Sequence, residues 1–510
     1  MEAKLAMRLY LSYILAILSG ILLFLCMPSY DLWFLAWIGF VPLLFALKNQ
    51  SPKHQYFMIN VACIIWSIGT HLWYPSVLSI SGYFIMIAGG FFYGFVFQIG
   101  YNMQNRITKW YSIFSIPIAF SVLEWVKTVL PVTKEWWIEL LPKSQWTFPE
   151  NLQILSVTGF IGLSFLIVLT NVIIFELILF KQQRKSKLIL LCILLLLPIG
   201  NYIYGKIVLS STETLLSSQP ISIGATVDLI NQDPSITSLG SNLKGGDGYL
   251  ADTEEMKKAI FDVNASLSKE IIAEKQVDFI VWGENEFMDL SDDEIYSNLK
   301  KLARTLNTSI ITDVVWQNEN TLYDTALMID QDGNEIGKTP KIFILSGEEE
   351  YGFSPGPRNY PVYETKHGKV ALAVCWDRHD PTIIQNYAKN GARLMLIPAD
   401  DDFEGNQQFP YFAASDAVFR AVENHVAIAT GSTSGIAQIV TPYGQINAIS
   451  GVNKREYIVG DTFITEQKTF YTNYGDVFAY ILTILFLILF VQSEINHRRS
   501  KALNAQTIKE

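Results

Sequence analysis

Hydrophobic residues follow two patterns along this chain. Long apolar runs dominate the N-terminal part and return near the C-terminus, each with the length of about 17 to 25 residues that crosses a bilayer. Eight such runs lie near residues 9–27, 31–47, 56–78, 83–101, 112–130, 154–180, 187–205 and 474–493. The pattern predicts an eight-helix transmembrane bundle in which a long insertion separates the last span from the others. No cleavage pattern follows the first run, so we expect a retained anchor and not a signal peptide.

The segment 206–473 shows shorter alternations. Runs typical of β-strands, among them "ISIGATVD", "VDFIVWGE", "VALAVCWD" and "RLMLIPAD", alternate with patterns typical of helices. The helices are expected near residues 253–274, 292–306, 381–390 and 409–424. This order predicts an α/β domain whose sheet is buried on at least one face. The polar stretch "SSTETLLSSQP" is typical of a linker to the bundle.

Basic residues gather in every second connection between successive apolar runs and beside the first and last runs. They gather at Lys4 and Arg8, Lys48 and Lys53, Arg106 and Lys109, 181–187, and 497–501. If eight spans are counted, all of these groups fall on one side, which the positive-inside rule assigns to the cytoplasm. We therefore expect both termini in the cytoplasm and three parts: a transmembrane bundle at 1–205, an extracytoplasmic domain at 206–473, and the last span with a cytoplasmic tail at 474–510.

Composition and charge narrow the class of protein. Half of the residues are hydrophobic and 17% are charged, which is too apolar for a soluble protein of this length. The formal net charge is −10, with acidic residues gathered in the predicted outer domain. This distribution argues against nucleic acid as a partner.

The four cysteines draw attention to one position. Cys26, Cys63 and Cys192 fall in or beside predicted spans, whereas Cys375 stands alone in the outer domain, at the end of the strand "VALAVCWD". An extracytoplasmic cysteine without a disulfide partner is either a small apolar residue packed at a strand end or a nucleophile. A nucleophile requires a base and a positive charge nearby.

Several residues could activate that thiol. His379 lies four residues beyond it, although catalytic partners are normally brought together by the fold and not by adjacency. Glu284 ends the apolar run "VDFIVWGENEF", with Glu286 as a rival on the same face. Lys341 follows a predicted hairpin in "GKTPKIFILSGEEEYGF". Strand ends on one edge of an α/β sheet face a common crevice, which favours the glutamate and the lysine.

These motifs resemble a known family. A glutamate in W-x-E, a lysine after a "DG…GK" hairpin and a cysteine closing an apolar strand are similar to the nitrilase (carbon-nitrogen hydrolase) superfamily, whose domain is an αββα sandwich. Eight spans around such a domain resemble the apolipoprotein N-acyltransferase family, as do "SVLEW" and "FRAVENHVAIATGSTSG". The resemblance covers residues from about 9 to 490.

The resemblance implies a role for each residue. Glu284 matches the general base, Lys341 the lysine that stabilises the oxyanion, and Cys375 the nucleophile. Glu349, eight residues after Lys341, matches a further glutamate of the family's active site. Trp376 and Asp377 stand where the family usually carries Tyr-Glu and are expected to support the nucleophile.

An activity also follows from the resemblance. The protein is expected to move an acyl chain from a phospholipid, through a thioester on the cysteine, to the α-amine of a diacylated lipoprotein at the bacterial inner membrane. No cofactor and no metal are expected, because "ADDDFEG" lacks the ligand spacing of a calcium loop. The alternatives are a membrane-tethered amidase that uses the same three residues, and a degenerate family member that acts as a scaffold.

Some positions depart from the family pattern. Gly283 replaces the Pro or Ser of its W-P-E or W-S-E motif, residues 400–403 replace N-D-A-W, and no Pro-Phe-Gly precedes the glutamate after Lys341. These loops bear on substrate choice more than on the class of reaction. In the bundle, Glu124 and Lys127 are ionisable residues near the end of a predicted span, where such groups pair with each other or serve function.

Overall fold

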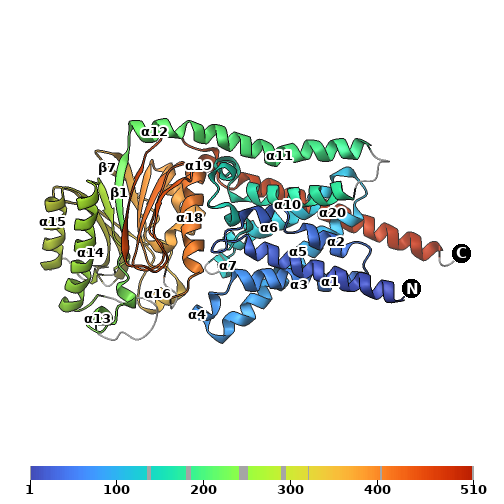
Figure 1. Ribbon diagram of the computed structural model, residues 1–510, viewed down its shortest axis with the longest axis horizontal. Helices are drawn as coiled ribbons and strands as arrows, with labels where there is room; N and C mark the ends of the chain where they lie inside the picture. The colour runs from blue at the N-terminus through green and yellow to red at the C-terminus, as the bar shows by residue number, and fades with distance from the viewer. Residues whose placement is uncertain are drawn as a thin grey trace. The chain divides into compact units, whose positions relative to one another are not determined.

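The computed structural model divides into two compact units (Figure 1). The first comprises residues 1–206 and 476–510, and the second comprises residues 207–475. The described residues are 2–134, 139–179, 185–240, 251–285, 287–288, 294–319, 321–401 and 405–507. Glu286 and residues 402–404 lie outside them.

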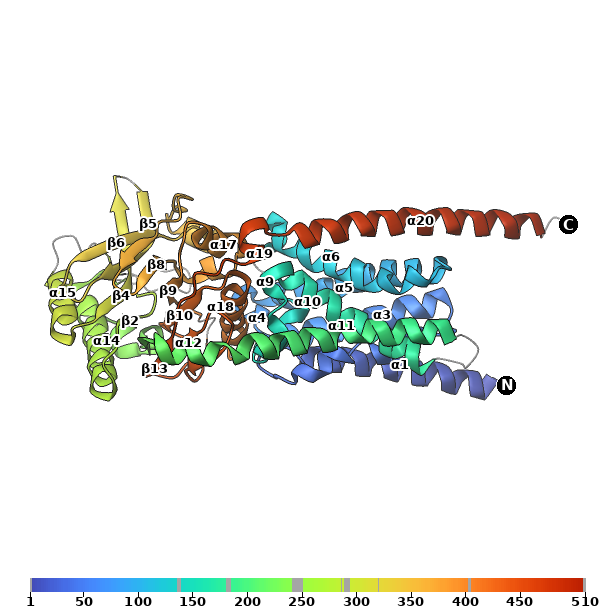
Figure 2. The same cartoon turned by 90° about the horizontal axis from the view of Figure 1, so that it is seen from above.

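The first unit is helical. Its longer helices α1, α3, α5, α6, α10 and α20 pack side by side (Figure 2). In chain order its elements are α1 (Glu2–Leu25), η1 (Trp33–Trp37), α2 (Val41–Leu47), α3 (Pro52–Thr70), α4 (Tyr74–Leu78), α5 (Ile80–Arg106), η2 (Trp110–Phe114), α6 (Ser115–Val129), α7 (Pro131–Lys134), η3 (Leu141–Gln145), α8 (Pro149–Leu152), α9 (Leu155–Thr158), α10 (Phe160–Ile178), α11 (Lys185–Ser210) and α20 (Val477–Thr507).

Six helical stretches among the described residues are long and apolar enough to cross a membrane. They are Ala6–Leu25, Ile80–Arg106, Trp110–Val129, Phe160–Ile178, Leu188–Ser218 and Val477–Ala502. The predicted run 31–47 folds instead as the short elements η1 and α2, because the chain bends before Pro42. The predicted run 56–78 overlaps α3, whose first turn carries the polar sequence Lys53-His54-Gln55. The structure thus supports several apolar spans and does not reproduce the predicted number.

A polar cluster lies inside this helical unit. Glu124 and Lys127 of α6 are fully buried. One carboxylate oxygen of Glu124 accepts the Leu141 N–H at 2.6 Å, and the other accepts the Ser164 hydroxyl. The Lys127 ammonium donates to the main-chain oxygen of Glu139. Buried charges need such partners, so these bonds tie α6 to the segment that contains η3.

The second unit contains all of the described strands. They are β1 (Ile221–Val227), β2 (Phe279–Val281), β3 (Phe287–Met288), β4 (Ser309–Asn318), β5 (Thr321–Ile329), β6 (Glu335–Pro340), β7 (Tyr363–Thr365), β8 (Gly368–Leu372), β9 (Leu394–Ala399), β10 (Ala427–Ser432), β11 (Gln438–Val440), β12 (Ile446–Ile449) and β13 (Glu456–Thr462). Its helical segments are α12 (Thr212–Ser218), η4 (Ile230–Gln232), α13 (Pro234–Thr237), α14 (Glu254–Glu274), α15 (Glu294–Leu306), α16 (Ser346–Glu350), η5 (Cys375–Arg378), α17 (Pro381–Lys389), α18 (Phe409–Asn424) and α19 (Phe470–Tyr474). The four helices expected in this segment are confirmed.

The strands form two sheets that stack face to face. One has the order β6-β5-β4-β2-β1 and the other β10-β9-β8-β7. They are joined where β1 meets β10, at the single pair Val227 and Ser432. Residues from both sheets, including Ile223, Ile311 and Leu396, fill the apolar core between them. The strands at the centre are parallel, so their carboxyl ends lie on the same edge.

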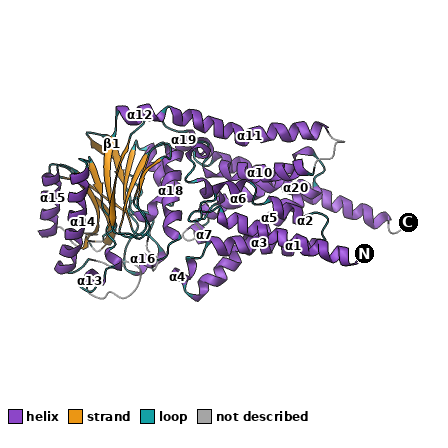
Figure 3. Cartoon of the chain, in the orientation of Figure 1, coloured by secondary structure: helices purple, strands orange, loops and turns teal. Residues whose placement is uncertain are grey.

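Helices cover the outer face of each sheet (Figure 3). In β2, Phe279 and Val281 belong to the core between the sheets, whereas Ile280 packs with residues of α14 and α15 on the outside. On the other side, α18 packs against β10 and β11. Both faces are therefore buried, which explains why these strands are apolar runs without polar alternation. The αββα sandwich implied by the resemblance is confirmed.

Candidate active site

Cys375 lies just beyond the end of a central strand. Strand β8 ends at Leu372, and Cys375 is the first residue of the turn η5, with φ +41°. Such a left-handed conformation is costly for a residue with a side chain and is found where the surrounding structure enforces it. The turn directs the buried thiol toward the next strand, where Sγ donates to the main-chain oxygen of Asp400 at 3.4 Å.

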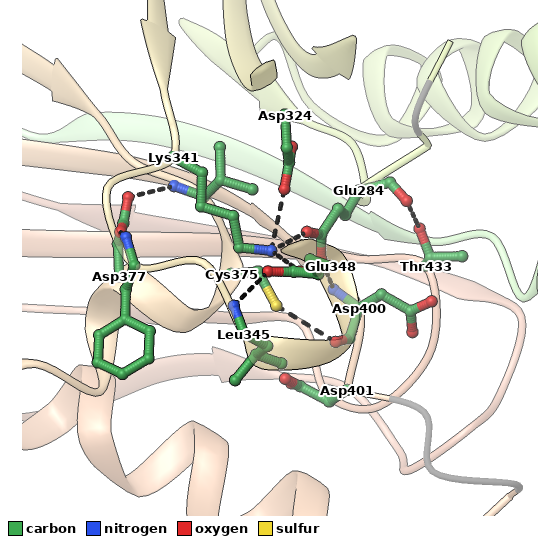
Figure 4. A network of polar contacts seen from close by, with 12 residues as sticks. Glu284, Asp324, Lys341, Leu345, Glu348, Cys375, Asp377, Asp400, Asp401 and Thr433 are labelled. Carbon is green, nitrogen blue, oxygen red and sulfur yellow. Dashed lines mark hydrogen bonds and ion pairs between the residues drawn. The ribbon is translucent and has the colours of Figure 1, made fainter. Parts of the chain in front are cut away.

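Glu284 comes to the same place from another strand. It follows β2, and its Oε2 accepts the main-chain N–H of Asp400 at 2.8 Å. Its own main chain is held on both sides, because its N–H donates to Ala399 O and its C=O accepts the Thr433 hydroxyl. Cys375 and Glu284 therefore bind the main-chain oxygen and the main-chain N–H of the same residue, Asp400 (Figure 4).

The departure at Gly283 has a steric reason. A Cβ at this position would lie 2.3 Å from the main-chain nitrogen of Thr433, far inside contact distance. The same residue binds the main chain of Glu284, so a larger side chain at 283 would displace that contact. The glycine thus allows the main chain after β2 to lie close to the main chain after β10.

Lys341 stands at the centre of the polar network (Figure 4). It follows β6 directly and is 1% exposed. Its Nζ lies 2.8 Å from Glu284 Oε1 and 2.9 Å from Asp324 Oδ2, and it also contacts Glu348 Oε1. The three carboxylates lie close enough together to hold a cation. In this structure the ammonium of Lys341 lies among them.

The electrostatics of the network follow from burial and these contacts. Burial works against the charged form of Lys341, but Asp324, Glu284 and Glu348 outweigh it, so the pKa of the ammonium lies well above its usual value. Burial, with the adjacent Glu284, raises the pKa of the Cys375 thiol well above its usual value, although Lys341 opposes this shift. The thiol is therefore neutral at rest, and it requires a base to remove its proton.

Asp377 connects the nucleophile turn to the lysine segment. Its Oδ1 accepts the N–H groups of Ile342 and Phe343, at 3.0 and 2.8 Å, and its Oδ2 accepts that of Val374 at 3.3 Å. Burial raises the pKa of Asp377 to about 7 against these hydrogen bonds. The residue fixes the main chain beside Lys341 to the main chain beside Cys375. Its neighbour Trp376 is buried and stacks on Phe409, with ring centroids 5.5 Å apart.

The alternative base His379 and the expected Glu349 make other contacts. His379 contacts α18, where its Nδ1 lies 2.6 Å from Asp416 Oδ2. Glu349 is exposed, and the residue before it, Glu348, contacts Lys341 instead. Three consecutive glutamates occupy positions 348–350, and the sequence alone does not show which of them contacts the lysine. The rival base Glu286 lies outside the described residues.

One member of the network had no role in the sequence analysis. Asp324 is 2% exposed and lies within the otherwise apolar part of β5. An acidic residue inside the buried run "YDTALMI" was the available signal, because buried carboxylates require a charged or hydrogen-bonding partner.

Comparisons with known proteins bear on the whole chain. Residues 19–173 match the family model of the apolipoprotein N-acyltransferase N-terminal domain, and residues 256–462 match that of carbon-nitrogen hydrolases. Proteins named apolipoprotein N-acyltransferase are similar over nearly the full length: that of Geobacter metallireducens is 27% identical, with 95% of this chain and 96% of the relative covered. That of Thermotoga maritima is 24% identical, with 96% of each covered.

Other matches are partial. A citrullinase of Francisella tularensis is 30% identical over 141 residues, which is 27% of this chain and 49% of the relative. Among solved structures, Saccharomyces cerevisiae Nit3, of the nitrilase superfamily, is 20% identical with a TM-score of 0.38, covering 48% of this chain and 90% of that one. The two family models match successive parts of the chain, and the acyltransferases match it from end to end. The chain therefore combines the N-terminal domain of the apolipoprotein N-acyltransferase family with a carbon-nitrogen hydrolase domain, and it is similar to apolipoprotein N-acyltransferases over nearly its full length.

Proposed function

We propose that this protein moves a fatty acyl chain from a membrane phospholipid to the α-amine of the diacylglyceryl-modified N-terminal cysteine of a lipoprotein. The observation that carries the proposal is the meeting of Cys375, Glu284 and Lys341 at one sheet edge, in a chain similar to apolipoprotein N-acyltransferases over its whole length. No single segment of the sequence contains this set.

In the first half-reaction, Glu284 takes the thiol proton and the Cys375 sulfur attacks the ester carbonyl of the phospholipid. The Lys341 ammonium stabilises the oxyanion of the tetrahedral intermediate, a contribution of about 3 kcal/mol for a preorganised donor. The C–O bond then breaks, and Glu284 returns its proton to the leaving glycerol oxygen. A lysophospholipid departs and an acyl thioester remains on Cys375.

In the second half-reaction, the acceptor's α-amine attacks the thioester. A new C–N bond forms, Glu284 takes a proton from the amine, and the C–S bond breaks with return of that proton to sulfur. The products are an N-acylated lipoprotein and the free thiol. Two substrates that bind in turn at one nucleophile predict ping-pong kinetics.

The proposal includes a position in the membrane. Both substrates are amphiphiles, so a catalytic domain tied to the bilayer at each end remains at the surface where they lie. We propose eight spans, two beyond the six long apolar helices, with both termini in the cytoplasm and residues 206–473 on the extracytoplasmic side of a bacterial inner membrane. The basic residues that flank the spans support this orientation.

A membrane-tethered amidase with the same three residues is the second candidate. Its support is the similarity to the citrullinase and to N-carbamoylputrescine amidases, which extends over about a quarter of this chain or less. Similarity to the acyltransferases extends over more than nine-tenths of it. The longer match, which includes the helical unit, favours acyl transfer.

Mass spectrometry of the full-length protein in phospholipid nanodiscs tests the proposal. We expect an acyl adduct on the Cys375 peptide that disappears when a diacylated lipopeptide is added, with N-acylated lipopeptide as product. Cys375→Ala should remove both signals, whereas Cys63→Ala, a matched change at a cysteine of the helical unit, should retain them. The absence of an adduct with every phospholipid tested, or an adduct that only water discharges, would refute acyl transfer.

A further inference from the structure

We infer that Asp324 is a positioning residue that holds the Lys341 ammonium in place while Glu284 carries the thiol proton, so that one N–H of the lysine becomes available to the oxyanion. This inference rests on the proposed function. It concerns a residue outside the Glu284, Lys341 and Cys375 set.

Asp324 holds the lysine at two points. Its carboxylate Oδ2 lies 2.9 Å from Lys341 Nζ, and its main-chain oxygen accepts the Lys341 N–H at 2.8 Å. The second bond continues the antiparallel ladder of β5 and β6, in which Thr325 pairs with Pro340. The register of the β5–β6 hairpin thus places both the main chain of Lys341 and the Asp324 carboxylate that contacts its ammonium.

All three N–H donors of the ammonium are engaged in this structure. Lysine offers three donors, and Nζ contacts three carboxylates, those of Glu284, Asp324 and Glu348. An oxyanion can therefore gain a donor only if one carboxylate gives it up. Proton transfer provides the means, since Glu284 becomes neutral when it takes the thiol proton and then accepts hydrogen bonds more weakly.

The other two contacts differ in rigidity. Asp324 lies within a nine-residue strand and its side chain is 2% exposed. Glu348 lies on the five-residue helix α16 and its side chain is 22% exposed. Asp324 is thus the partner that remains when Glu284 releases the ammonium. It also makes the largest single contribution among the charges that stabilise the charged form of Lys341.

A second carboxyl group supports the charge on Asp324. Burial raises the pKa of Asp324, but Lys341 and the fully buried Asp313 on β4 outweigh it, so that the pKa of Asp324 lies below its usual value. The titratable groups that face the ammonium from the surrounding elements are Glu284, Asp324, Glu348 and Cys375, with Asp313 behind Asp324.

The test is the pH dependence of acyl-enzyme formation by full-length variants in phospholipid nanodiscs. Asp324→Asn keeps the shape and removes the charge. We expect its maximal rate to fall by about tenfold or more, with KM for phospholipid nearly unchanged. The high-pH limb of the variant's pH–rate profile should shift to lower pH by about one unit or more, because Lys341 loses its main counter-charge. Asp332→Asn, an exposed carboxylate in the following hairpin, should behave as wild type.

A purely structural role for Asp324 would lower the rate equally at every pH and leave both limbs in place, and that result would overturn the inference. Asp313→Asn provides an independent arm, since it changes the neighbouring buried carboxyl group and leaves the Asp324 carboxylate beside Lys341, so we expect an unchanged high-pH limb. A downward shift in Asp313→Asn would assign the charge to Asp313 and refute the role of Asp324, even if Asp324→Asn does not fold.

Alkylation of Cys375 by iodoacetamide separates this inference from the proposed function, because it needs neither lipid substrate. Removal of a negative charge lowers the pKa of its neighbours, so we expect the alkylation profile of Asp324→Asn to move to lower pH. If wild type forms no acyl-enzyme but this shift occurs, the proposed function fails and the electrostatic role stands. An unshifted alkylation profile contradicts the role directly.

Discussion

The bonds of Asp377 allow a prediction that can be worked out in detail. Asp377→Asn preserves the size of the side chain and one oxygen acceptor, but it turns the second oxygen into an N–H₂ group. That group would face the N–H of Val374, a donor against a donor. Val374 is fully buried, so water cannot replace the lost bond. We expect a loss of about 1–3 kcal/mol in the free energy of unfolding, the usual cost of a buried unsatisfied group.

Asp377→Ala removes all three acceptor contacts. The main-chain N–H groups of Val374 and Ile342 are buried, whereas Phe343 is partly exposed and can turn to water. Two unsatisfied buried donors correspond to about 2–6 kcal/mol. Because the same bonds hold the segment after Lys341, the rate of acyl-enzyme formation should fall as well. Each increase of about 1.4 kcal/mol in the activation free energy lowers the rate tenfold.

The pH dependence of the loss has a definite sign. Burial raises the pKa of Asp377 to about 7, above its value of about 4 in the unfolded chain. The folded state therefore holds the proton more tightly, and ionisation of Asp377 costs stability as the pH rises from about 4 to 7. Asparagine does not titrate, so the stability difference between wild type and Asp377→Asn should be smaller at pH 8 than at pH 5.

Thermal unfolding of the full-length protein in detergent, followed by tryptophan fluorescence at both pH values, measures these differences. The rate of Cys375 acylation is measured on the same samples. Glu349→Gln serves as the control, because it changes an exposed carboxylate in the segment that follows Lys341. An Asp377→Asn variant with wild-type stability and wild-type acylation would refute the assigned bonds, and a difference that grows toward pH 8 would refute the sign.

Three further predictions follow from single contacts. Glu348→Gln should slow acyl-enzyme formation by about 10- to 100-fold, as expected when a charged hydrogen bond to Lys341 is weakened. The rate of Glu349→Gln should stay within about twofold of wild type, and the reverse order in stopped-flow measurements would contradict the role of Glu348. His379→Ala removes the hydrogen-bond partner of the buried Asp416 Oδ2 and should lower the free energy of unfolding by about 1–3 kcal/mol, without moving either limb of the pH–rate profile; loss of a limb would instead make the histidine a base. Glu124→Gln in the helical unit should lower the midpoint of thermal unfolding in detergent, since it weakens the acceptor for Leu141 N–H and removes a buried charge; an unchanged midpoint would show that this cluster does not stabilise the bundle.

The candidate residues that the sequence identified share one property. Cys375, Glu284 and Lys341 each follow an element that can be recognised from a local pattern, either an apolar strand or a hairpin. Parallel strands place such residues at a common edge, so local patterns were enough to propose that they meet. The same reasoning disfavoured His379, but it could not show that the histidine contacts Asp416, because this contact depends on how α18 packs on the nucleophile turn.

By itself, the sequence determined that the chain has long apolar helices and an α/β insertion, since run length and periodicity are local properties of side chains facing lipid or a core. Which side chains complete the network depends on the packing of distant segments. Glu348 and Glu349 are neighbours in sequence, but consecutive residues of a helix point about 100° apart, so one contacts Lys341 and the other faces solvent. Asp324 lies beside the lysine because of the β5–β6 register, which depends on the turn and on the pairing of two strands and not on the sequence of either strand alone.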